Sequence, residues 1–306
     1  MGQKHPFPVD PVLTQIAMAY RNAAMIADSV LPRIPVGGEV FKFTRYEKDE
    51  RFNTPDTLVG RKSRVPEVEF GATEDEASVR DYGLEDPIPQ ADINAAGSRY
   101  NPVEQAVEAM QDLIALGREV RVSSMVMDAN NYGADNKKAV ANAWTDKANS
   151  TPLDDLLEAL DAPLMRPNVV AFGMANWRAL STNPQIVKAV HGNSGDSGVA
   201  RRQQVAELLE VDEILVGQSY VNTAKKGQAA SFQRVWDGVL AFHRNPAANT
   251  RNGITYGFTG QYGDRVSGQW EDKNIGLRGG QRVRTGESVK ELITAPDLAY
   301  LLTGTV

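Results

Sequence analysis

The longest regular pattern of apolar positions in the chain runs from Asn101 to about Asn130. Asn101 can cap a helix here, Pro102 suits its first position, and the cluster of Asn and Gly at 130–133 ends it. Apolar or small residues recur three and four positions apart, at Val103, Ala106, Val107, Met110, Leu113, Ile114, Gly117 and Val120. At about 1.5 Å per residue, this helix would be on the order of 40 Å long. Such a length fits either a long core helix or a strut in an extended subunit, and both interpretations stay open.

A shorter helical pattern covers the N-terminal segment. Apolar residues between Pro11 and Asp28 favour an amphipathic helix that ends near Leu31 and Pro32. This helix could pack within its own subunit, or it could be an arm that lies against a neighbouring subunit. The pattern supports both interpretations equally.

Alternating apolar and polar residues predict two strands on either side of a charged tract. The first strand covers residues 39–46, where Phe41 and Phe43 fall on one side, and the second covers 77–82. The tract between them, residues 47–64, is rich in arginine and acidic side chains and has too few apolar residues to form a core. So long a loop is unusual inside a compact domain. The tract is therefore either disordered or ordered by something outside the subunit, and the flanking strands predict a large hairpin.

The second half of the chain mixes helical and strand patterns. Helix start signals or helical spacing mark helices beginning near Pro152, Asn183 and Val199. Short apolar runs are typical of buried strands at 168–173, 213–217 and 235–243. Residues 152–250 therefore indicate a mixed α/β domain. From Gly253 onward, alternating segments punctuated by glycine predict a β-rich, antiparallel C-terminal part.

Composition narrows the class of protein. The 306 residues are 42% hydrophobic, which is enough for a sizeable core. No apolar run approaches the ~20 residues of a membrane span, and the N-terminus has no secretory pattern, so the predicted compartment is the cytoplasm. The absence of cysteine excludes disulfides and thiolate chemistry. A formal charge of −6 disfavours a protein that grips nucleic acid tightly.

No motif assembles into an active site. Ser197 lies in a Gly-Asp-Ser-Gly stretch that resembles a serine-protease nucleophile segment. That mechanism needs a distant histidine base and a buried aspartate, whereas His191 is only six residues from Ser197 and His5 lies near a terminus. Asp128 begins a segment like a calcium loop, yet Ala139 stands where a bidentate glutamate is required. The chain contains no phosphate-binding loop. The sequence therefore predicts no catalytic residue, no metal ligand and no cofactor.

The order of these segments resembles that of the major capsid proteins of tailed bacteriophages, which have the Hong Kong 97-type fold. Local sequence agrees over nearly the whole chain, at residues 31–36, 167–173, 177–180, 183–187, 199–209, 213–217, 222–227 and 235–236. Each of these pieces is degenerate, so the specificity of the resemblance lies in their order.

The resemblance implies an α+β fold of the Hong Kong 97 type. Residues 1–37 would be an N-terminal arm and 38–86 an extended E-loop hairpin. Residues 87–151 would form the first part of a P-domain with its spine helix at 101–130. Residues 152–250 would be an α/β A-domain, and 251–306 the C-terminal strands of the P-domain.

The resemblance also implies a function. The chain would be a major capsid protein, not an enzyme, that self-assembles into pentamers and hexamers of an icosahedral head. It would enclose double-stranded DNA without sequence-specific binding, contact no membrane, and assemble in the host cytoplasm. The first helix begins near Pro11 and leaves no room for a leading scaffold segment, so a separate scaffolding protein is expected.

Other expected partners are copies of the chain itself, a portal and decoration proteins, although the use of decoration proteins stays open. Candidate inter-subunit contacts lie in the charged tract, at Arg51, Phe52, Arg61, Lys62 and Arg64. Two alternatives remain at this stage. An encapsulin-like nanocompartment shell would share the fold, and a soluble α/β enzyme is the other possibility.

Overall fold

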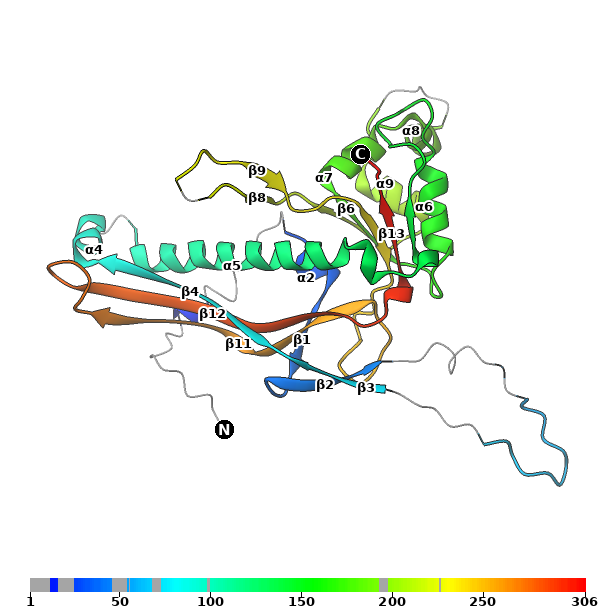
Figure 1. Cartoon of the computed structure of the whole chain (residues 1–306), viewed down its shortest axis with the longest axis horizontal. Coiled ribbons are helices and arrows are strands. Elements are labelled where there is room, and N and C mark those ends of the chain that lie inside the picture. The colour runs from blue at the N-terminus through cyan, green and yellow to red at the C-terminus, as the bar shows by residue number, and fades with distance from the viewer. Residues whose placement is uncertain are drawn as a thin grey trace.

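The computed structural model describes residues 12–15, 25–45, 54, 56–67, 73–97, 100–192, 198–225 and 227–306. Figure 1 shows two parts: a long helix, α5, that lies along three long strands, and a compact mixed part at one end of this helix. The helices α2 (Ala27–Val30), α4 (Gln90–Ala96) and α5 (Pro102–Val126) precede the compact part in the chain.

A four-stranded sheet runs along α5 in the order β1-β11-β12-β4. Its strands are β1 (Arg33–Val36), β4 (Arg80–Pro89), β11 (Gly257–Asp272) and β12 (Gly280–Ile293). The three long strands are antiparallel, and β1 is parallel to β11. Along β12, the side chains of Val283, Thr285, Glu287 and Val289 alternate with more exposed ones and are buried. The apolar face of α5 covers this side, with Val107 and Met110 packed near Val283.

The long helix forms as its sequence pattern predicts. The Asn101 side chain accepts a hydrogen bond from the Val103 N–H at 3.0 Å, and Pro102 occupies the first turn. The helix ends at Val126, four residues before the predicted end, and a short 3-10 turn follows at Ala129–Asn131. The Asp128 side chain caps that turn, which is why the helix stops early.

The prediction of one helix that begins near Pro11 and ends near Leu31 is correct at its end but wrong in being continuous. Residues 12–15 are helical, but Met25 and Ile26 are not, and a separate turn of helix begins at Ala27. The backbone N–H groups of Ile26 and Ala27 donate to the Glu119 carboxylate on α5 rather than to helical carbonyls. A contact with a distant part of the chain thus overrides the local helical pattern.

The strands β2 (Val40–Arg45) and β3 (Thr73–Ser78) pair in antiparallel fashion and flank the charged tract, which confirms the predicted hairpin. Phe41 and Phe43 pack against Phe258 of β11. The predicted single strand over 77–82 is wrong, because the chain changes partners at Val79. The Val79 N–H donates to the Glu39 carbonyl at 2.8 Å, after which β4 pairs with β12.

The compact part holds a five-stranded sheet in the order β5-β13-β10-β6-β7. Its strands are β5 (Lys137–Ala139), β6 (Val169–Gly173), β7 (Glu213–Gly217), β10 (Val239–Phe242) and β13 (Ala299–Thr303). Its helices are α6 (Pro152–Asp161), α7 (Met174–Ser181), α8 (Pro184–His191) and α9 (Arg202–Leu209). Fully buried Trp144, Leu156, Phe172 and Leu180 belong to its core. The C-terminal strand β13 joins this sheet, not the one that contains β11 and β12.

A small hairpin of β8 (Tyr220–Asn222) and β9 (Phe232–Arg234) projects from the compact part (Figure 1). The loop predicted at 191–198 lies largely outside the described residues. Among the helices that the structure describes, none has a stretch long and apolar enough to cross a membrane.

Candidate functional site

The charged tract carries three of the five predicted contact residues within the described part of the chain. Arg61, Lys62 and Arg64 are exposed, as are the other described residues at 54 and 56–67, and from here on we extend the charged tract to residue 67. The Ser63 N–H donates to the Gly60 carbonyl at 2.9 Å, so the chain turns at Arg61 and Lys62. No hydrogen bond or ion pair joins these three side chains to another described residue. Arg51 and Phe52 lie outside the described residues.

Apolar side chains of the tract are also uncovered. Leu58 is 84% exposed and Val65 is 71% exposed, although both are large enough to contribute to a core. The described tract therefore shows cations and apolar groups together on a segment that leaves the body of the subunit (Figure 1). Such a mixture is typical of a surface that binds another protein chain.

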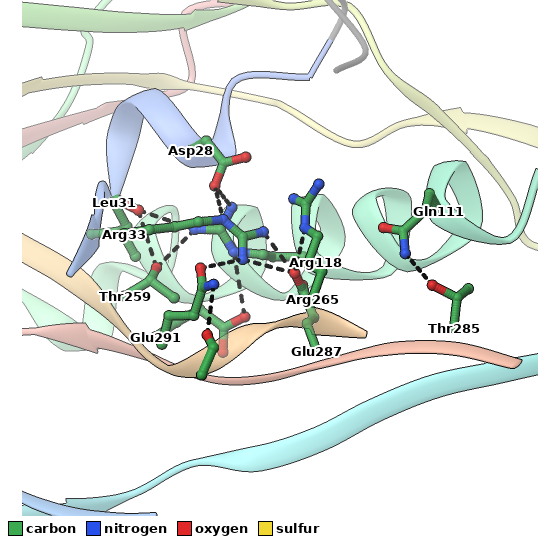
Figure 2. Close-up of polar contacts among 12 residues, drawn as sticks. Asp28, Leu31, Arg33, Gln111, Arg118, Thr259, Arg265, Thr285, Glu287 and Glu291 are labelled. Atoms are coloured by element: carbon green, nitrogen blue, oxygen red, sulfur yellow. Dashed lines mark hydrogen bonds and ion pairs between the residues drawn. The ribbon is translucent and has the colours of Figure 1, made fainter. Parts of the chain in front are cut away.

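A second feature, which we call the polar junction, joins the N-terminal segment to α5 and the long sheet (Figure 2). Its centre is Arg118, whose side chain is 2% exposed. The guanidinium pairs with Asp28 and donates hydrogen bonds to the Leu31 carbonyl at 3.0 Å and the Thr259 hydroxyl at 2.8 Å. Because a buried cation is costly unless it is paired, these partners fix the N-terminal segment against α5.

The arginines of the junction favour the ionised form of the Asp28 and Glu287 carboxylates. Burial opposes ionisation of Asp28, but the charges of Arg118 and Arg33 outweigh burial and lower its pKa. The buried Glu287 behaves in the same way: burial raises its pKa, and Arg33 and Arg265 lower it below the ordinary value. The Glu287 carboxylate lies 2.7 Å from Arg33 and 3.1 Å from Arg265. The network therefore ties β1 to β11 and β12.

The neighbouring residue on α5, Glu119, is fully buried. Its carboxylate accepts hydrogen bonds from the N–H groups of Ile26 and Ala27, both at 2.8 Å, and from the indole of Trp236. Burial raises its pKa above the ordinary value, although these hydrogen bonds oppose the shift. The adjacent residues Arg118 and Glu119 of α5 thus bind different residues of the N-terminal segment.

The sequence analysis missed the polar junction, but a signal for it was present. Arg118 continues the spacing of Met110 and Ile114, so a charged residue stands on the face that packs against the sheet. A charge at such a position indicates a buried partner elsewhere in the chain. The identity of that partner, Asp28, depends on a contact 90 residues away in sequence.

Neither feature has the arrangement of a catalytic centre. Among the residues described, no group of three or more His, Asp or Glu side chains could hold a metal ion. The polar junction consists of salt bridges and hydrogen bonds that position chain segments. The described part of the charged tract is an exposed surface that carries cationic and apolar side chains. Both features suit a structural protein.

Comparison with known proteins gives relatives over the whole chain, although no protein-family model matches. The chain is 50% identical over 304 residues to the major capsid protein of Pseudomonas phage JBD67, and the match covers 98% of each chain. The solved structure of a phage-related protein from Bordetella bronchiseptica is 22% identical, with a TM-score of 0.77, covering 98% of this chain and 99% of that one.

The capsid structure of cyanophage P-SCSP1u is 15% identical, with a TM-score of 0.59, and the match covers 93% of this chain and 89% of the cyanophage chain. At sequence identities this low, the two solved structures are evidence for the fold alone. They confirm the predicted α+β fold as one shared with phage capsid structures.

Proposed function

Because this chain belongs to the family of phage major capsid proteins, we propose that it self-assembles into pentamers and hexamers that close an icosahedral head around the phage genome. Its relatives are structural capsid proteins and not enzymes. The chain accordingly forms the capsid of a phage particle by association with copies of itself. The number of subunits per ring and the enclosure of DNA are the proposed part.

One observation carries the proposal: the charged tract is exposed along its whole described length, 54 and 56–67. The body of the subunit offers it no hydrogen bond within the described residues, and its apolar groups Leu58 and Val65 stay in solvent. A segment that cannot fold on its own subunit gains order by binding another. We assign the tract to contacts with a neighbouring subunit, through Arg51, Phe52, Arg61, Lys62 and Arg64.

We also propose the division into capsid regions that the resemblance to capsid proteins implies. We assign residues 1–37 to an N-terminal arm, 38–86 to the E-loop, and 87–151 together with 251–306 to the P-domain with its spine helix. Residues 152–250 would be the A-domain. The strands β5 and β13 are assigned to the P-domain by sequence position but pair inside the sheet of the A-domain, so the two proposed domains share one sheet.

The proposal includes partners beyond the chain itself. A separate scaffolding protein would guide shell size, a portal would occupy one vertex, and decoration proteins could bind the outside. Assembly would take place in the host cytoplasm. A net charge of −6 supports a container that holds double-stranded DNA without binding its sequence.

The test combines limited proteolysis with particle counting. The tract should be the first site cut in the unassembled subunit and should be protected in shells. A chain with Arg51→Glu, Arg61→Glu and Arg64→Glu should fold with unchanged circular dichroism but form few shells. The matched control reverses three exposed cations elsewhere, with Lys147→Glu, Arg178→Glu and Lys273→Glu. Normal shell formation by the first variant, or a tract that resists protease before assembly, would contradict the proposed contact.

A further inference from the structure

The hairpin β8–β9 is a surface that its own subunit leaves uncovered. Every residue of β9 is exposed, and Val221 is the only residue of β8 with a partly covered side chain. Phe232 is 68% exposed and Tyr220 is 48% exposed. A two-stranded ribbon without a covered face is marginally stable in water. Among the described residues, the subunit therefore leaves most of this hairpin uncovered and free to contact a surface outside it.

One face of this hairpin combines aromatic and basic groups. Tyr220 lies directly opposite Arg234, and Asn222 lies opposite Phe232, so these four side chains share a face. The Arg234 guanidinium lies 4.9 Å from the centre of the Tyr220 ring. From Gln218 to Trp236 the chain has three basic residues, Lys225, Lys226 and Arg234, and no acidic residue. The hairpin is thus positive in a chain whose net charge is negative.

The first half of α5 has the opposite character. From Asn101 to Gly117 the chain has three acidic residues and no basic residue. The three acids, Glu104, Glu108 and Asp112, are spaced four apart and therefore form one row along the helix.

A second row beside the acids is formed by Gln105, Ala109 and Leu113, and all three are exposed, with Leu113 at 59%. The acidic row thus lies beside a row whose exposed members include the apolar Ala109 and Leu113.

We propose that the β8–β9 hairpin of one subunit binds this two-row face of α5 on a second copy of the chain. The aromatic rings would cover Ala109 and Leu113, while Lys225 and Arg234 would lie over the acidic row. Opposite charge and matching apolar area support this pairing of surfaces. The two surfaces are different parts of one chain, so the contact is head to tail, which is the kind that closes rings of subunits. The inference rests on the proposed assembly into shells.

A charge exchange tests the pairing. Lys225→Glu with Arg234→Glu should raise the protein concentration needed for shells by about tenfold, because like charges then face each other. Gln105→Lys with Glu108→Lys should have the same effect. A chain with all four changes should recover shell formation, because opposite charges are restored. Circular dichroism and the thermal midpoint show whether each variant folds.

A cross-linking experiment identifies the partner. The chain has no cysteine, so Ser231→Cys with Ala109→Cys introduces the only two thiols, both at exposed positions. In shells, a short bis-maleimide should give a ladder of covalent dimers and higher multimers. Each single variant should give only single, uncross-linked chains on a denaturing gel. The control pair Ser231→Cys with Ala139→Cys, whose second thiol is exposed on β5, should do the same.

Four outcomes count against the inference. A cross-linked monomer would mean that the hairpin binds its own helix. Shells without any ladder, or a failure of the fourfold variant to recover, would show that the two surfaces do not meet. If the variant Lys225→Glu with Arg234→Glu forms shells normally but these shells hold less DNA, the partner of the hairpin is nucleic acid. If the unaltered chain forms no shells at all, the proposed function fails instead.

Discussion

The indole Nε1 of Trp236 donates a hydrogen bond to the carboxylate of Glu119, and both side chains are buried. Trp236 precedes β10 in the compact part of the subunit, whereas Glu119 lies on α5. The same carboxylate accepts the N–H groups of Ile26 and Ala27. Three segments that are far apart in sequence therefore meet at one side chain.

Trp236→Phe should lower the free energy of unfolding by about 2–4 kcal/mol, because a hydrogen bond to a buried carboxylate and part of a packed ring are lost. Chemical denaturation measures the loss. The control is Trp177→Phe, since Trp177 is buried in the compact part but donates no hydrogen bond from its indole to a described residue. This control loses the same ring volume without losing a hydrogen bond, so it should cost less than Trp236→Phe, by about 1–3 kcal/mol for the buried acceptor that loses a partner. An equal loss of unfolding free energy in the two variants would show that the hydrogen bond to Glu119 does not contribute to stability.

Glu287→Gln should change how stability depends on acid. The pKa of Glu287 in the folded chain lies below its ordinary value of 4.5. Its contribution is therefore fully present above pH 4.5 and is lost as the pH falls through the lower, folded pKa. At neutral pH the variant should be less stable by about 3 kcal/mol, because Arg33 and Arg265 lose a buried partner.

Denaturation curves at several pH values test this dependence. The difference between the two proteins should shrink as the pH falls below 4.5. Glu39→Gln is the matched control, because Glu39 is exposed and has no ion pair with a described residue. The control should follow the unaltered chain at every pH. A constant difference for Glu287→Gln would contradict the assigned role of its charge.

Two glycines should respond in opposite ways to alanine. At Gly117 within α5, the nearest atom to an added Cβ would be an Arg121 nitrogen at 3.8 Å, so the change fits. Gly117→Ala should stabilise the chain by about 0.5–1 kcal/mol, since glycine is a poor helix former. At Gly217 the same atom would lie 2.2 Å from the Trp236 ring. Gly217→Ala should therefore destabilise by about 1–3 kcal/mol through overpacking, and thermal melts compare the two variants.

Much of the secondary structure could be predicted because it is encoded locally. The N-cap at Asn101, the Pro at 102 and the spacing of apolar residues are enough to place the start of α5. Asn183 marks α8 in the same way, and its side chain accepts the Gln185 N–H at 3.0 Å. Alternation of Phe41 and Phe43 gives β2. These signals need no distant partner, and the structure confirms them.

The errors arose where a distant contact decides the local structure. Met25 and Ile26 are not helical, and the Ile26 N–H donates to Glu119, 93 residues away, rather than to a helical carbonyl. At Val79 the chain makes its last hydrogen bond to the β2 side, at Glu39, and from Arg80 onward it pairs with the distant β12. The strand β13 could not be assigned to a sheet, since pairing depends on β10 and β5. The contact candidates Arg61, Lys62 and Arg64 remain predictions, because a partner subunit is needed to test them.

Electron microscopy of particles formed by the purified chain, with and without a scaffolding protein, shows whether the chain assembles into a capsid. We expect closed shells built from rings of five and six subunits, with the charged tract of each subunit lying on a neighbour. A chain that stays monomeric under all assembly conditions and elutes as a compact sphere would contradict this expectation.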